Sequence, residues 1–282
     1  MNWSRAKNLL LFGLVVTNLL LLGFLYARWD RTRDGTESRA FTRKVLALLD
    51  ERHIEVKANF LRRAVSLSPL QVEFETKTRD ELNRAFFNNE ATAEITPTKT
   101  VLTRGTEVIT LYEDRHFTYE RGYDAQGEDL SEKAAEEVAK QFLEERGIAT
   151  GDMELAAVKP QKEGLLLNFV KLYEGTYVER TSTEVLVDKE GVRSLSRTWL
   201  TVLEAVPSSI ALPPANRALL TLLDDHRYDG KIVEEIAPCV SFDPGQDAYV
   251  VDPTAAQRGR AMPAWRIRFS DQEVLIVSAR GG

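Results

Sequence analysis

Residues 130–148 read LSEKAAEEVAKQFLEERGI, and this stretch predicts the helix around which the neighbouring sequence is arranged. Ser131 is a good N-cap, and Leu130 can pack against Ala135 as a hydrophobic staple. Gly147 fits a left-handed C-terminal cap, the conformation in which many helices end. The sequence therefore specifies both ends of this helix.

The predicted helix has one apolar face that needs a covering partner. Glu136 and Lys140 are expected to pair one turn apart on its outer surface. The apolar face consists of residues at helical spacing, namely Ala135, Val138, Ala139, Phe142 and Leu143. A sheet is expected to cover this face.

Strand-like runs follow the helix and supply that sheet. They are separated by turn-forming residues and cover 153–158, 165–173, 176–187 and 192–202. Connections this short cannot make parallel crossovers, so an antiparallel meander is expected. A weaker copy of the same order is expected next, with a helix over 218–223, strands at 232–240 and 248–251, and a hairpin of 263–269 with 273–279.

The first half of the chain predicts a mixture of short helices and strands. Helical spacing of apolar residues is found over 41–49, and a second short helix is expected over 80–88. Strand-like alternation is found at 53–56, 70–74, 100–102 and 107–112. The expected fold class is therefore α+β throughout.

An apolar segment near the N-terminus predicts a membrane anchor. No charged residue lies between Asn8 and Ala27, and about 20 helical residues span roughly 30 Å, the thickness of a hydrocarbon core. Trp3 and Trp29 flank the segment as interfacial residues do. A cleaved secretory signal is the competing interpretation, although the apolar run is longer than such signals usually have. The expected topology is a single pass with the N-terminus cytoplasmic and the bulk of the chain extracytoplasmic.

The predicted domain organisation follows from this anchor. Residues 1–30 form a cytoplasmic tail and transmembrane anchor, residues 31–127 an N-terminal α+β extracytoplasmic region, and residues 128–282 a C-terminal helix-plus-antiparallel-sheet region. The net charge is −6 and no Lys/Arg-rich block is present, so nucleic acid is not an expected partner. Cys239 is the only cysteine, which excludes an intramolecular disulfide.

The sequence has no catalytic or metal-binding motif. His53, His116 and His226 are far apart, and no H-E-x-x-H, C-x-x-C or phosphate-binding loop is present. Cys239 is expected to be a packed apolar residue. We therefore expect a protein that is not an enzyme and that needs no cofactor or metal. Trp199 and Trp265 lie in strand-like runs and are either core residues or aromatic anchors at a protein interface.

Several stretches resemble one family. The opening MNWSRAKNLLLFGLVVTNLLLL, the hairpin LLLNFVKLYEGTYVERTSTEVLVDKEGVRSLSRTWL and the late PAWRI are similar to YycI proteins, the membrane-anchored regulators of the WalK/WalR (YycG/YycF) two-component system of Gram-positive bacteria. The resemblance implies PepSY-like helix-plus-sheet units outside the membrane. It also implies a sensor histidine kinase and a YycH-like protein as partners.

The resemblance gives a possible role to a polar residue inside the anchor. Asn18 is costly to leave unpaired in hydrocarbon, and a partner helix is the usual remedy. Gly13 and Thr17 form a small-xxx-small pair that lets another backbone approach closely. The alternative is that Asn18 bonds within its own helix or to a water defect, and that Gly13 is incidental. Two functions are therefore expected: a kinase regulator that uses this helix, or an envelope binding module that recognises a peptide or cell-wall fragment and uses the helix as a passive tether.

Overall fold

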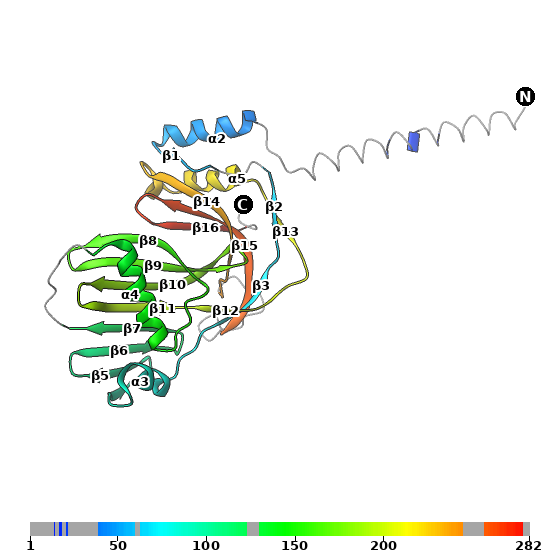
Figure 1. Cartoon of the computed structure of the whole chain (residues 1–282). Helices are drawn as coiled ribbons and strands as arrows, with labels where there is room; N and C mark the ends of the chain where they lie inside the picture. Colours follow the sequence, from blue (N-terminus) through cyan, green and yellow to red (C-terminus); the bar gives the residue numbers. More distant parts are fainter. Residues whose placement is uncertain are drawn as a thin grey trace, which may run out of the picture.

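The computed structural model describes residues 14, 17, 18, 21, 39–59, 63–122, 130–244 and 257–278. The described chain is a sheet-dominated α+β fold, as the sequence predicts (Figure 1). Its α-helices are α2 (Arg39–Glu51), α3 (Arg79–Phe87), α4 (Glu132–Glu145) and α5 (Ala215–Leu220), and α5 continues into short 3-10 turns at Thr221–Asp224 and His226–Tyr228.

The described strands belong to one large branched sheet and one small two-stranded antiparallel sheet. The strands are β1 (Glu55–Val56), β2 (Val65–Leu67), β3 (Leu70–Phe74), β4 (Thr92–Ile95), β5 (Lys99–Arg104), β6 (Glu107–Tyr112), β7 (His116–Arg121), β8 (Met153–Gln161), β9 (Gly164–Tyr173), β10 (Thr176–Asp188), β11 (Gly191–Thr198), β12 (Leu200–Ala205), β13 (Ile210–Leu212), β14 (Ile232–Ser241), β15 (Arg258–Phe269) and β16 (Val274–Ser278). Only β2 and β13 lie outside the large sheet.

Helix α4 has the ends that the sequence predicts. The Ser131 hydroxyl accepts a hydrogen bond from the Ala134 N–H at 3.3 Å, and Gly147 adopts a φ of +68°. Lys140 donates to Glu136 at 2.7 Å on the outer side. The helix lies across one face of the sheet over β9, β10 and β11 (Figure 1). The caps therefore mark both ends of the helix, and its buried residues Ala135, Ala139 and Leu143 hold it on the sheet.

One half of the sheet is antiparallel and runs in the order β8-β9-β10-β11-β7-β6-β5-β4. This confirms the predicted meander. The run predicted at 192–202 is two strands, because the chain leaves β11 at Trp199 and β12 pairs instead with β3. Helices α3 and α4 cover the inner face, and their apolar residues form one core with the strands.

The second half runs in the order β12-β3-β15-β14, with β16 added beside β15 and β1 at the start of β14. Helices α2 and α5 pack on it and form a second core. Trp265 is central to that core, and its indole N–H donates to the Pro213 carbonyl at 2.8 Å. The hairpin predicted at 263–279 is confirmed by β15 and β16 over the described residues. The strand predicted at 248–251 lies outside them.

The predicted boundary between residues 127 and 128 runs through this architecture. Strand β7 pairs with β11, and β3 pairs with both β12 and β15. The first core likewise contains side chains from both sides of that boundary, such as Phe86 and Leu143. Segments that the sequence analysis separated therefore share one sheet.

The predicted anchor lies mostly outside the described residues. Within the part that is described, no helix combines the length and the apolar character needed to cross a membrane.

Removing apolar volume from α4 should destabilise the fold. Leu143 is fully buried beneath the helix, so Leu143→Ala leaves a cavity and should lower the free energy of unfolding by about 2–5 kcal/mol. Urea unfolding of the full chain in detergent measures this loss. Lys133→Ala, at an exposed position of the same helix, is the matched control and should change stability by less than about 0.5 kcal/mol. Equal effects of the two substitutions would contradict the packing of α4 on the sheet.

Candidate functional site

Strand β10 forks the sheet. Its first part, at Tyr177–Glu179, pairs in parallel with β14, whereas its later part, from Ser182 onward, pairs antiparallel with β11. The opposite edge of β10 pairs with β9 on both sides of a register shift between Val178 and Thr183. The two halves of the sheet therefore diverge at residues 179–182, where β10 bulges.

The bulge is closed by side-chain hydrogen bonds. Arg180 adopts a left-handed φ of +65°, which turns the chain out of the ladder. The Thr181 hydroxyl donates to the Val178 carbonyl at 2.6 Å and accepts from the Lys171 N–H at 3.2 Å. Thr181 is buried, so these bonds satisfy main-chain groups that water cannot reach.

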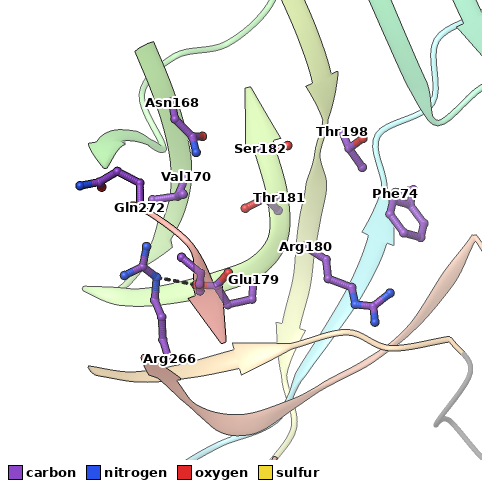
Figure 2. Close-up of a pocket in the computed structure, with 11 residues that line it drawn as sticks. Phe74, Asn168, Val170, Glu179, Arg180, Thr181, Ser182, Thr198, Arg266 and Gln272 are labelled. Carbon is purple, nitrogen blue, oxygen red and sulfur yellow. Dashed lines mark hydrogen bonds and ion pairs between the residues drawn. The ribbon is translucent and has the colours of Figure 1, made fainter. Parts of the chain in front are cut away.

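An open cleft of about 530 Å³ lies at this fork (Figure 2). Its lining includes Asn168 and Val170 of β9 and Gln272, in the turn before β16. The rest of the lining consists of the bulge residues 179–182, Arg266 of β15, Phe74, Thr198 and Val274. At the bulge, Arg180 extends to Asp243 and pairs with it at 2.9 Å. The cleft thus collects side chains from strands that are distant in sequence.

Arg266 is the most buried charge of the cleft. Its side chain is 3% exposed, and its guanidinium pairs with Glu179 at 2.8 Å and with Glu235 at 2.6 Å. It also lies over the ring of Tyr177, 4.6 Å from the centroid. Arg268 pairs with the same Glu235 at 3.0 Å, which extends the ion pairs into a network. A buried arginine requires such partners, because an unpaired charge in the interior is costly.

Glu179 has a perturbed acidity. Burial raises the pKa of its carboxyl group, and the negative charge of Glu235 adds to this effect. Arg266 opposes both but is shared between the two carboxylates. The Glu179 pKa therefore lies above its ordinary value.

A second buried ion pair lies on the other side of β10. Arg197 donates to Glu75 at 2.6 Å and to the Thr183 hydroxyl at 2.7 Å. Burial acts to raise the pKa of Glu75, but Arg197 and Lys77 together hold it below its ordinary value. The guanidinium also lies over the Trp199 ring at 4.4 Å. These contacts tie β11 to the end of β3, so their role is structural.

The tryptophans proposed as interface residues are core residues. Trp199 is 3% exposed and Trp265 is 2% exposed. Trp199 is enclosed beside Arg197, and its indole N–H points to Asp152 at 3.4 Å. An aromatic anchor at a protein interface must be exposed on the surface, and both rings are buried. Of the two interpretations of these tryptophans, the structure therefore favours core residues.

The residues predicted to contact a partner helix are only partly described. Thr17 and Asn18 are helical and exposed. Gly13 lies outside the described residues. Their role as a helix interface stays a prediction.

The residues considered for chemistry are dispersed. His116 contacts the Thr198 hydroxyl at 2.9 Å, and His226 contacts Asp229 at 2.9 Å on the surface. No cluster of metal-ligating side chains occurs among the residues that the structure describes. Cys239 is fully buried in β14, and burial raises the pKa of its thiol well above the ordinary value.

Sequence reasoning did not identify the cleft. Glu179 and Arg180 interrupt the apolar alternation of 176–187, and a polar interruption of this kind is the one local indication of a bulge. The partner of Glu179, Arg266, is located far along the chain and has no signature of its own.

This chain is similar to known proteins in its fold. The sequence matches no protein-family model and no curated protein. The crystal structure of YycH from Bacillus subtilis is similar with a TM-score of 0.58 at 12% identity, over 78% of this chain and 53% of that chain. This chain therefore has a YycH-like fold, and it spans about half the length of YycH. An uncharacterized protein from Eubacterium rectale is similar with a TM-score of 0.51 at 12% identity, over 84% of this chain and 94% of that one.

Replacing Glu179 should change how stability depends on pH. Its folded-state pKa is raised above 4.5, so its stabilising contribution is complete below that value and is lost as pH rises through the folded-state pKa. Glu179→Gln has no such loss. The free energy of unfolding of the variant, relative to wild type, should therefore increase from acid to neutral pH in a urea-unfolding series.

Glu184→Gln is the matched control, because it removes an exposed carboxylate from the same strand. A relative stability of Glu179→Gln that decreases over the same pH range would show that Arg266 outweighs burial.

Proposed function

We propose that this protein is a non-enzymatic, membrane-anchored regulator of a sensor histidine kinase of the WalK/YycG type. In this proposal the extracytoplasmic domain and the transmembrane helix contact the kinase and a YycH-like partner. A regulator of this kind shifts the kinase between signalling states only by the difference in its affinity for them. The protein is located in the cell membrane, crosses it once and has its N-terminus in the cytoplasm.

The fold similarity to YycH is the observation that carries the proposal. It extends over most of the chain, and it agrees with the resemblance of the N-terminal, hairpin and PAWRI stretches to YycI proteins.

A second function is supported by the cleft at the fork of β10. In this alternative the protein is an anchored envelope binding module that recognises a peptide or cell-wall fragment, and its helix is a passive tether. A cleft of about 530 Å³ with mixed lining is a suitable size for such a ligand. The two functions differ in whether the identity of the helix matters.

A helix exchange separates the two functions. Residues 9–26 are replaced by an unrelated apolar span of the same length in the native host. A regulator that uses its helix should lose kinase co-purification and alter transcription from the response regulator's promoters, because the helix contacts are gone. Immunoblots of the membrane fraction control for abundance. Unchanged co-purification and transcription at normal abundance would reject the helix interface and favour the tether.

A single substitution tests the polar residue of the helix. Asn18→Leu removes an interhelical hydrogen bond worth about 0.6–2 kcal/mol, so kinase or YycH-like partner binding should weaken about three- to thirtyfold. Quantitative co-purification from detergent measures this loss. Leu14→Ile keeps the helix apolar and is the control. Full recovery of the partner by the Asn18 variant would show that Asn18 bonds within its own helix or to water and does not bond to a partner helix.

A further inference from the structure

Helix α2 carries its charged residues in two groups on its exposed side. The cations Arg39, Arg43 and Lys44 lie in its first half, and the acids Asp50 and Glu51 end it. This order is the reverse of the one that stabilises a helix, because the helix macrodipole favours acids near the N-terminus and cations near the C-terminus. The stability of α2 itself therefore does not explain where its charges lie.

The three cations of α2 are exposed and form no ion pair with any described residue. Cations nearby behave differently. Arg52, just after the helix, pairs with Asp229 at 2.6 Å, and Lys231 pairs with Asp271 at 2.7 Å. The positive charge of the first half of α2 is therefore available to a partner outside the described chain.

The apolar side of α2 is already used by the fold. Val45 and Leu49 are buried in the second core. An amphipathic helix that inserts into a bilayer buries its apolar side among the lipids, and α2 has no such side to offer. What α2 presents outward is its polar side, on which Ala47 and Leu48 are exposed beside the cations.

The neighbouring helix adds a cation at the same end of the molecule. Helices α2 and α5 pack side by side (Figure 1). Near their first turns, the Asn216 side chain donates to the Thr42 hydroxyl at 3.1 Å. Near their last turns, Arg52 donates to the Leu223 carbonyl at 3.3 Å. The two helices therefore run in the same direction, and exposed Arg217 of α5 lies at the end where the cations of α2 are found.

This basic end is also the end that the chain reaches first after the predicted anchor. The apolar run ends at Ala27 and α2 begins at Arg39, so at most about 40 Å of extended chain separates them. A short tether keeps the helix at a high effective concentration next to the bilayer surface. A weak electrostatic attraction is then enough to hold α2 against that surface.

We propose that the basic face of α2, formed by Arg39, Arg43 and Lys44, lies on the outer surface of the membrane and binds the headgroups of anionic phospholipids. The contact is electrostatic and stays at headgroup depth, because the apolar side of the helix is buried in the protein. It fixes the orientation of the extracytoplasmic domain relative to the bilayer. The inference rests on the membrane anchor of the proposed function and adds a lipid partner to it.

Quenching of a fluorophore on α2 tests this contact. Ala47→Cys places a reactive thiol on the exposed side of the helix, since Cys239, the only native cysteine, is buried. The labelled full chain is reconstituted into phosphatidylcholine nanodiscs with or without phosphatidylglycerol. These contain a nitroxide either at the headgroup or deep in the acyl chain. Strong quenching is expected only from the headgroup nitroxide and only with phosphatidylglycerol.

A second label position controls for quenching that is not specific to α2. Glu94→Cys carries the fluorophore on exposed β4, which pairs with β5 in the other half of the sheet. Its quenching should be the same with and without phosphatidylglycerol.

Neutral variants identify the cations. The triple variant Arg39→Gln, Arg43→Gln and Lys44→Gln keeps the helix propensity of α2 and removes charges that oppose its macrodipole, so it should fold. Each cation lost near an anionic surface should lower the ratio of docked to undocked helix about fivefold. The triple variant should therefore be quenched as weakly with phosphatidylglycerol as without it.

The matched control removes the same net charge from exposed positions elsewhere, with Arg84→Gln, Lys133→Gln and Lys162→Gln in one chain. It should keep the dependence on phosphatidylglycerol. Wild type in about 1 M salt, where the Debye length falls to about 3 Å, should behave like the triple variant of α2. This measurement needs no substitution in the basic face.

Two results would overturn the lipid contact alone. One is equal headgroup quenching of the Ala47 label with and without phosphatidylglycerol in a chain that has entered the nanodisc. The other is a dependence on phosphatidylglycerol that persists in the triple variant of α2. A chain that does not enter nanodiscs would reject the anchor, and this inference with it. Kinase co-purification tests the regulatory role separately.

Discussion

The hydrogen bonds of Thr181 are the constraint on which the rest of the architecture depends. Its hydroxyl serves Val178 and Lys171 at once, so the bulge of β10 leaves neither of these main-chain groups unsatisfied. With the bulge closed, one strand pairs with β14 before the fork and with β11 after it. Both halves of the sheet therefore extend from a single strand, and the cleft is the space between them.

Buried arginines fix which strands meet at the fork. Arg266 joins β15 to β10 and β14, and Arg197 joins β11 to the end of β3. Buried ion pairs add little net stability compared with apolar packing, but breaking one leaves an uncompensated charge inside the protein. A shift in the strand register would separate Glu179 from Arg266, or Glu75 from Arg197, and leave a buried charge without its partner. The arginines therefore act against alternative pairings, whereas the apolar clusters supply the stability.

The sequence predicts the elements whose determinants are local. Helix α4 was predictable because Ser131, Gly147 and the apolar face lie within one short stretch, and the hairpins were predictable because their turns are adjacent to their strands. The parallel pairing of Tyr177 with Cys239 was not predictable, because neither residue carries any local mark of the other. The α+β class can therefore be predicted from short stretches of sequence, whereas the fork depends on strands that are distant in sequence.

The difference between local and distant determinants also explains why the cleft at the fork does not contain the site residues that the sequence predicts. An arginine in a strand-like run is ordinarily a surface residue. Arg266 of the PAWRIRF run is buried because the carboxylates of Glu179 in β10 and Glu235 in β14 compensate its charge. Trp199 lies in a strand-like run, but the chain changes partner strands at that residue. The predicted helix residues Gly13, Thr17 and Asn18 concern another part of the chain altogether.

The pairing of early strands with late ones has a consequence for how the chain folds. β1 pairs with β14, and β3 pairs with β12 and β15, so these short N-terminal strands have no sheet partner until much of the chain has been synthesised. Closing such long loops is entropically costly, and folds rich in distant contacts form slowly. The first strands to emerge are therefore among the last to be paired, and their edges stay open to other chains for the longest part of biogenesis.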